Sequence, residues 1–148
     1  MAVRIFEEIP GIKISGKRLV YTWIHNCAGK EHWKVGALNI ILVTDKRLLE
    51  INRTFLNHNY YTDIVTFNYN QEDHISGDLY ISIERVVENA KEFCIPEVNE
   101  LLRVMIHGVL HLMGYDDKKK RDQKIMRGKE DVYLQSIDEA RIKIHGKV

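Results

Sequence analysis

Two histidines spaced four residues apart are the side chains in this sequence best suited to chemistry. His107 and His111 lie in the segment HGVLHLMGYDD, inside an apolar stretch that predicts a helix. Residues four apart lie on the same face of a helix, so both imidazoles can bind one metal ion. Gly114 ends the predicted helix and lets the chain turn back, which brings Asp117 within reach of the same ion. Three protein ligands with an open fourth position are typical of a catalytic zinc site.

The residue after the first histidine argues against one class of zinc enzyme. Peptidases of the HExxH type carry Glu at that position as the general base, whereas this chain has Gly108. A metal-dependent phosphodiesterase acting on RNA has other options. The metal can polarise a phosphoryl oxygen or supply hydroxide, and the 2′-OH of the RNA can serve as the nucleophile. The sequence does not choose between these two routes.

Helices and strands that must position these residues are predicted from apolar periodicity and run length. The helix with the two histidines is expected to begin at Pro96 and to run to Met113, because proline suits a first helical turn. The other predicted elements are helices at 17–32, 45–55 (with Asp45 as N-cap), 84–93 and 121–143, and strands at 35–44, 63–69 and 77–83. The last two strands are too close for a crossover helix, so we expect a hairpin and an α+β fold.

Composition is that of one globular domain spanning residues 1–148. The chain has 148 residues, of which 45% are apolar. Apolar runs stay short of the roughly 20 residues that span a bilayer. The N-terminal segment carries acidic residues where a signal peptide would have an apolar core, so we expect a cytoplasmic protein without a membrane anchor. Cys27 and Cys94 form no CxxC pair and are predicted to be small buried apolar residues. No heptad pattern is visible, which favours a monomer.

Charge is distributed unevenly along the chain. The net charge is only +1, which excludes a uniformly basic nucleic-acid binder. Residues 118–148 nevertheless hold 10 of the 22 basic and 5 of the 21 acidic residues, a charge of +5, which leaves −4 on residues 1–117. This basic segment starts beside the predicted metal site with Lys118, Lys119, Lys120 and Arg121. We interpret these four side chains as a patch that contacts RNA phosphates.

Three sequence blocks resemble those of the YbeY family. The segment HGVLHLMGYD at residues 107–116 is similar to the family signature HGxLHLxGYDH. Residues 51–67 resemble the block LNxxxRxxxxxTDVLSF, and residues 77–82 resemble a block of Gly-Asp followed by a strand. The blocks occur in the family's order, and the resemblance covers at least residues 37–134.

This resemblance implies a small mixed β-sheet packed with several helices, with the metal site at the end of a central helix. It also implies a single-domain, zinc-dependent endoribonuclease that prefers single-stranded RNA and holds one zinc ion per chain. Its expected substrates are ribosomal RNA or ribosomal particles. Its expected roles are maturation of the 16S 3′ end and ribosome quality control.

Two positions depart from the family pattern. The third ligand is usually His, but this chain has Asp117, whose carboxylate also binds zinc. Its negative charge should make the metal a weaker Lewis acid. The block at residues 51–67 usually contains an Arg that contacts the RNA phosphate, where this chain has Leu56. Arg53 or His58 could take over that contact.

Two other functions remain open at this point. One is a non-catalytic ribosome-assembly factor in which the metal only ties the last two helices together. The other is a zinc peptidase, which would have to draw its general base from a residue other than Gly108.

Overall fold

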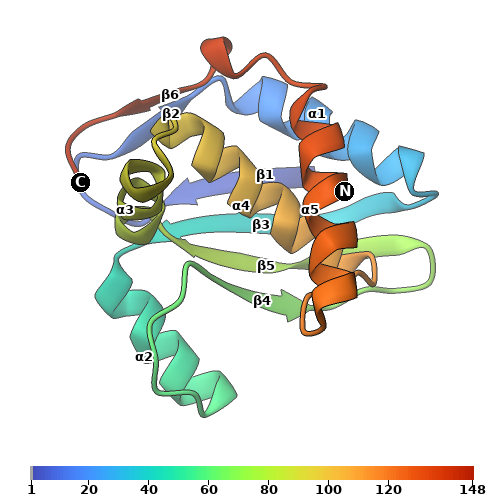
Figure 1. Ribbon diagram of the computed structural model, residues 1–148, viewed down its shortest axis with the longest axis horizontal. Helices are drawn as coiled ribbons and strands as arrows, with labels where there is room; N and C mark the ends of the chain where they lie inside the picture. Colours follow the sequence, from blue (N-terminus) through green and yellow to red (C-terminus); the bar gives the residue numbers. More distant parts are fainter. Residues whose placement is uncertain (1) are drawn as a thin grey trace.

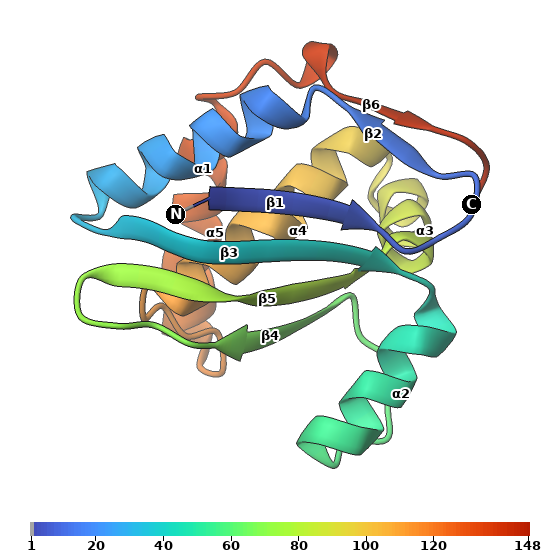
Figure 2. The same cartoon turned by 180° about the vertical axis from the view of Figure 1, so that it is seen from behind.

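A four-stranded mixed sheet backed by helices is the centre of the molecule. The computed structural model describes residues 2–148, in which the strands are ordered β1-β3-β5-β4. Strands β1 (Ala2–Glu7), β3 (Lys34–Val43) and β5 (His74–Ser82) run parallel, and β4 (Ile64–Asn68) pairs antiparallel with β5. Figures 1 and 2 show the sheet from its two sides. The predicted α+β fold with a mixed sheet and a β4–β5 hairpin is confirmed.

Alternation along the central strands places one apolar face of the sheet against the helices. Leu38, Ile40 and Leu42 of β3 are fully buried, and Ile40 is in register with the equally buried Leu79 of β5. Helix α4 (Glu97–Leu112) lies across this face between α3 (Ile83–Phe93) and α5 (Lys120–Leu134) (Figure 1). Helix α1 (Lys17–Lys30) packs beside β1. The core thus surrounds the helix that carries both histidines.

Helix α2 (Asp45–Leu56) contacts the opposite face of the sheet and extends beyond its edge (Figure 2). Leu48 and Ile51 of α2 pack against Ile41, Val43 and Val65 in a second, smaller apolar cluster. The side chain of Thr44 accepts from the backbone N–H of Arg47, so Thr44 is the N-cap and the prediction of Asp45 was wrong by one residue. Among residues 2–148, no helix combines the length and apolar character that a bilayer span needs.

The C-terminal segment departs most from the sequence prediction. Helix α5 ends at Leu134, not near residue 143. Ser136 donates its hydroxyl to the carbonyl of Tyr133, and Asp138 accepts from the N–H of Ala140, so short polar side chains bond locally and end the helix. A 3-10 turn (Glu139–Arg141) then leads into β6 (Lys143–His145), which pairs antiparallel with β2 (Lys13–Ser15).

Three further features differ from the predicted pattern. Strands β1 and β2 were not predicted: β2 has three residues with one buried side chain, and the alternation of β1 rests on only two buried residues, Val3 and Ile5. Helix α1 stops at Lys30, two residues early. Cys27 is buried as predicted, but Cys94 is exposed. It lies in the turn between α3 and α4, with a φ of 56° that places its backbone in the left-handed region.

Glu31 joins the end of α1 to α5. Its carboxylate accepts from the hydroxyls of Tyr115 (2.5 Å) and Tyr133 and from the Lys129 ammonium (2.9 Å). Burial raises the pKa of Glu31, but the three donors lower it by more, so its pKa lies below the ordinary value. This cluster fixes α5 beside the segment that follows the two histidines.

Candidate metal centre

The two histidines project from the last two turns of α4. His107 and His111 are one helical turn apart, and their Nε2 atoms are 3.0 Å from each other. Their side chains are about one quarter exposed (23% and 27%), which leaves the imidazoles accessible from a cleft. The predicted shared face is therefore confirmed in its geometry.

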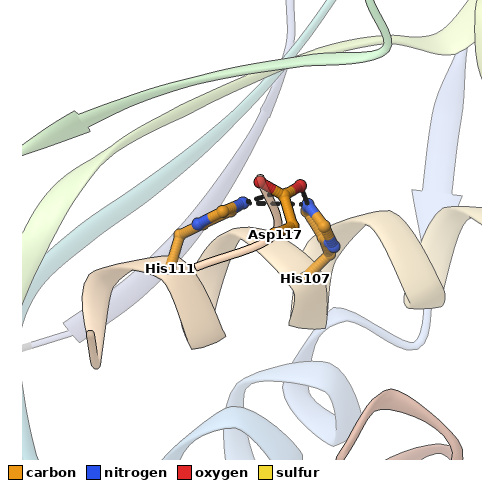
Figure 3. Close-up of side chains that lie close together, drawn as sticks. All are labelled: His107, His111 and Asp117. Atoms are coloured by element: carbon orange, nitrogen blue, oxygen red, sulfur yellow. Dashed lines mark hydrogen bonds and ion pairs between the residues drawn. The ribbon is translucent and has the colours of Figure 1, made fainter. Parts of the chain in front are cut away.

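A Schellman motif at the end of α4 brings Asp117 back over the helix. The N–H of Tyr115 donates to the carbonyl of Leu110 (3.1 Å), and the N–H of Gly114 donates to the carbonyl of His111 (3.0 Å). Gly114 has a φ of 99°, a conformation that glycine adopts without steric cost. The chain reverses, and Asp117 Oδ2 lies 3.3 Å from His107 Nε2 and 3.4 Å from His111 Nε2 (Figure 3).

These three donor atoms fit a tetrahedral metal ion. Their separations of 3.0, 3.3 and 3.4 Å form a nearly equilateral triangle. Ligands at zinc bond lengths of about 2.0–2.1 Å and tetrahedral angles stand roughly 3.3 Å apart. Within residues 2–148, His107, His111 and Asp117 are the group of His, Cys, Asp and Glu side chains whose donor atoms come close enough to hold one ion. Two imidazoles and one carboxylate leave a fourth position for solvent or substrate.

Glu130 orients His107 from behind the site. Its Oε2 accepts from His107 Nδ1 at 2.7 Å, and its Oε1 accepts from Arg103 Nη1 at 2.8 Å, in a position only 4% exposed. With the proton held on Nδ1, His107 presents Nε2 to a metal ion. Burial lowers the pKa of His107, but the hydrogen bond and charge of Glu130, together with the charges of Asp117 and Asp63, outweigh burial and raise it overall.

Glu130 was not among the site residues predicted from the sequence. A signal for it was present, because Glu130 lies on the same helical stripe as the buried residues Met126 and Tyr133. An acidic residue on the apolar face of a helix needs a polar partner in the core.

Asp63 borders the metal group at the start of β4. It lines two cavities that meet at His107 and Asp117, one of about 620 Å³ and one of about 380 Å³. Burial raises the pKa of Asp63 above its ordinary value, although the nearby His107 charge opposes the shift. The TD block of the sequence thus lies beside the site.

Gly108 faces the sheet, away from the metal group. A Cβ at this position would stand 2.7 Å from Ile64 Cδ1 and 3.0 Å from Leu79 Cδ1. A glutamate at position 108 would crowd the side chains of Ile64 and Leu79 on the sheet. This packing removes the HExxH type of peptidase chemistry from the site.

The basic candidates lie at different distances from the metal group. Lys118 lines the 620 Å³ cavity together with His107, His111 and Asp117, and so do Leu56 and His58. Lys119 is exposed at the start of α5, and Lys120 and Arg121 line a separate surface hollow along α5. Arg53 on α2 donates to the side chain of Asn59 and is not among the residues that line the 620 Å³ cavity. The structure therefore places Lys118 and His58 on the wall of the cavity that holds the metal group, and Lys119, Lys120, Arg121 and Arg53 outside that wall.

Comparisons with known proteins identify the family of this chain. Residues 8–138 match the family model described as Endoribonuclease YbeY. The chain is 50% identical to the Endoribonuclease YbeY of Flavobacterium psychrophilum over 112 residues, which cover 76% of this chain and 80% of that protein. It is 40% identical to the Endoribonuclease YbeY of Parabacteroides distasonis over 142 residues, 94% of this chain and 98% of that protein.

A solved structure supports the fold as well. The solution structure of TM1509 from Thermotoga maritima superimposes with a TM-score of 0.65 at 34% sequence identity, covering 90% of this chain and 87% of that one. A family match over most of the chain and relatives at 40–50% identity point to the same assignment. This chain belongs to the Endoribonuclease YbeY family.

Proposed function

We propose that this protein is a zinc-dependent endoribonuclease that cleaves single-stranded ribosomal RNA. Its proposed role is maturation of the 16S 3′ end and ribosome quality control, as a monomeric single domain with one zinc ion per chain. The observation that carries the proposal is the triangle of His107, His111 and Asp117 donor atoms at the wall of a cavity that also contains Lys118. Family membership supplies the reaction class.

Each residue of the site has a separate task in this proposal. A zinc ion held by the triad would polarise a phosphoryl oxygen and lower the pKa of a bound water. Glu130 keeps the His107 proton on Nδ1. Lys118 is placed to pair with phosphate oxygens that approach the same cavity wall. The RNA-binding surface would continue along α5 through Lys119, Lys120 and Arg121. Arg53 would contact the RNA only where the strand passes α2.

Cleavage of a single-stranded RNA by purified, zinc-loaded protein tests the proposal. We expect cleavage by the wild type and its loss in His111→Ala. His25→Ala is the matched control, because His25 is also helical but is exposed on α1. Equal cleavage by the wild type and His111→Ala would identify a contaminating nuclease.

The same assay separates the other candidate functions. RNA binding that survives His107→Ala, without cleavage by the wild type, would indicate a non-catalytic assembly factor. Fragments that end in a 2′,3′-cyclic phosphate would show attack by the RNA 2′-OH, whereas attack by water leaves no cyclic end.

A further inference from the structure

A second cavity opens beside the metal group, on the other side of His107 from Lys118. It has a volume of about 380 Å³ and lies between α3, α4 and α5. His107 and Asp117 form the end that it shares with the metal group. Its other walls combine apolar and hydrogen-bonding side chains: Asn89, Phe93, Glu100, Val104, Met126 and Arg127.

Glu100 is the residue in this cavity that lacks a partner. It is 4% exposed, and its Oε1 has no hydrogen-bond partner in the structure. Burial raises the pKa of Glu100, and the nearby negative charge of Asp63 adds to that effect. A buried carboxylate oxygen without a donor is costly to the folded protein, so the position favours a ligand that brings N–H donors.

Phosphate and metal ions do not suit this cavity. Four carboxyl groups line the wall (Asp63, Glu100, Asp117 and Glu130), against two guanidinium groups (Arg103 and Arg127), both of which pair with Glu130, so the excess negative charge repels a phosphate. Among residues 2–148, the group whose donor atoms lie close enough to hold an ion is His107, His111 and Asp117, and Glu100 is not part of it. The apolar side chains of Val104 and Met126 are buried, and the Phe93 ring is 55% exposed. Such walls fit a flat ring that has donors on one edge.

The spacing of Glu100 and His107 along α4 is comparable to the length of one nucleotide. The two sites on α4 are seven residues apart, which corresponds to about 10 Å along a helix axis. That is close to the reach of a nucleotide from its phosphate to the far edge of its base. A scissile phosphate at the metal group would therefore place a neighbouring base in this cavity.

We infer that the cavity between α3, α4 and α5 binds a guanine base next to the scissile phosphate, and that Glu100 recognises it. This inference rests on the proposed endoribonuclease function. N–H donors on a ligand favour the ionised form of Glu100 and so oppose the effect of burial, and an ionised carboxylate accepts hydrogen bonds and donates none. Guanine is the RNA base with two adjacent N–H donors on one edge, N1–H and the 2-amino group. Single-stranded RNA is commonly read through bases splayed into pockets, with their pairing edges hydrogen-bonded and their faces against aromatic rings.

A binding assay with three oligonucleotides tests this inference without requiring cleavage. Each is an oligouridine with one central guanosine, inosine or adenosine, titrated by fluorescence anisotropy against full-length protein in excess chelator. Inosine keeps N1–H but lacks the 2-amino group. We expect the inosine and adenosine RNAs to bind about tenfold more weakly than the guanosine RNA, the discrimination typical of a bidentate base contact.

Two variants on α4 isolate the role of Glu100. Glu100→Gln keeps the side-chain size and should bring guanosine and inosine RNAs to within about twofold of each other. Glu97→Gln makes the same charge change at an exposed position three residues earlier and should keep the tenfold difference. Equal affinity of the wild type for guanosine and inosine RNAs, or no measurable affinity for either, overturns the inference. So does a guanosine preference that survives Glu100→Gln.

Cleavage mapping separates this inference from the proposed function. Zinc-loaded wild type that cleaves RNA without regard to guanine retains the proposed function and overturns the inference. A guanosine preference in binding, with no cleavage, supports the cavity assignment and counts against the nuclease. Circular dichroism of Glu100→Gln verifies that the variant is folded. The comparison of guanosine and inosine RNAs on the wild type tests base recognition without any variant.

Discussion

Glu130→Gln should weaken metal binding about tenfold. Glu130 accepts from His107 Nδ1 at 2.7 Å, and this contact keeps Nε2 free for the metal. Glutamine has the same shape, and its Oε1 can still accept from Nδ1. The substitution therefore removes the negative charge behind His107 and retains a neutral hydrogen bond there, while the amide NH2 turns toward Arg103 Nη1, which loses this acceptor and keeps Asp131.

The magnitude follows from the strength of that contact. Hydrogen bonds to charged groups contribute about 1.5–3 kcal/mol, against about 0.5–1.5 kcal/mol for neutral ones, so the loss is roughly 1 kcal/mol. Removing the partner of a metal-ligating histidine lowers metal affinity by about 10–100-fold. We expect the lower end of that range, because Arg103 Nη1, 2.8 Å from Glu130 Oε1, already neutralises part of the Glu130 charge. Tenfold corresponds to about 1.4 kcal/mol.

Competition for zinc with a chromophoric chelator measures this affinity directly. Asp131→Asn is the matched control. Asp131 also accepts from Arg103 (Nη2, 2.7 Å), but it is exposed and does not touch His107. Zinc affinity of Glu130→Gln equal to that of the wild type and of Asp131→Asn would refute the role assigned to Glu130.

Three further outcomes are expected from the fold. The pKa of Glu31 is lowered in the folded state, so its contribution to stability is present above about pH 4.5 and is lost as pH falls. Urea unfolding between about pH 5 and 3 should show a steeper loss of unfolding free energy for the wild type than for Glu31→Gln. A thiol reagent should modify Cys94 in the native protein and Cys27 only after unfolding, because Cys27 is buried and burial raises its pKa to about 12. Rapid modification of both thiols in the native protein would contradict the packing of α1. Gly108→Ala should destabilise the protein by about 1 kcal/mol, the cost of crowding the sheet less the gain in helix propensity. Gly128→Ala, with open space around the added Cβ, should instead stabilise it in thermal melts.

Features encoded by short spacings were predictable from the sequence. The pair His107 and His111 required only helix periodicity, and the position of Asp117 required only that Gly114 end the helix. The β4–β5 hairpin followed from two alternating strands separated by a polar segment. Family blocks in the correct order supplied the mixed sheet.

Features that depend on tertiary contacts were not predictable. Glu130 is 23 residues from His107, and its place on the apolar stripe of α5 indicates a buried partner without identifying His107 as that partner. The end of α5 depends on local bonds of Ser136 and Asp138, and its polar continuation to residue 143 resembles a helix in composition. Glu100 lies in the first turn of α4, and only the packing of α3 and α5 against that helix buries it in a cavity wall.

The anomalous-scattering crystal structure of the zinc-loaded protein tests the metal centre most directly. The expected result is one zinc ion per chain, bound by Nε2 of His107, Nε2 of His111 and a carboxylate oxygen of Asp117 at about 2.0–2.2 Å, with a fourth position open to solvent. A zinc ion held elsewhere, or one whose four positions are all filled by protein atoms, would contradict the catalytic metal centre proposed for this chain.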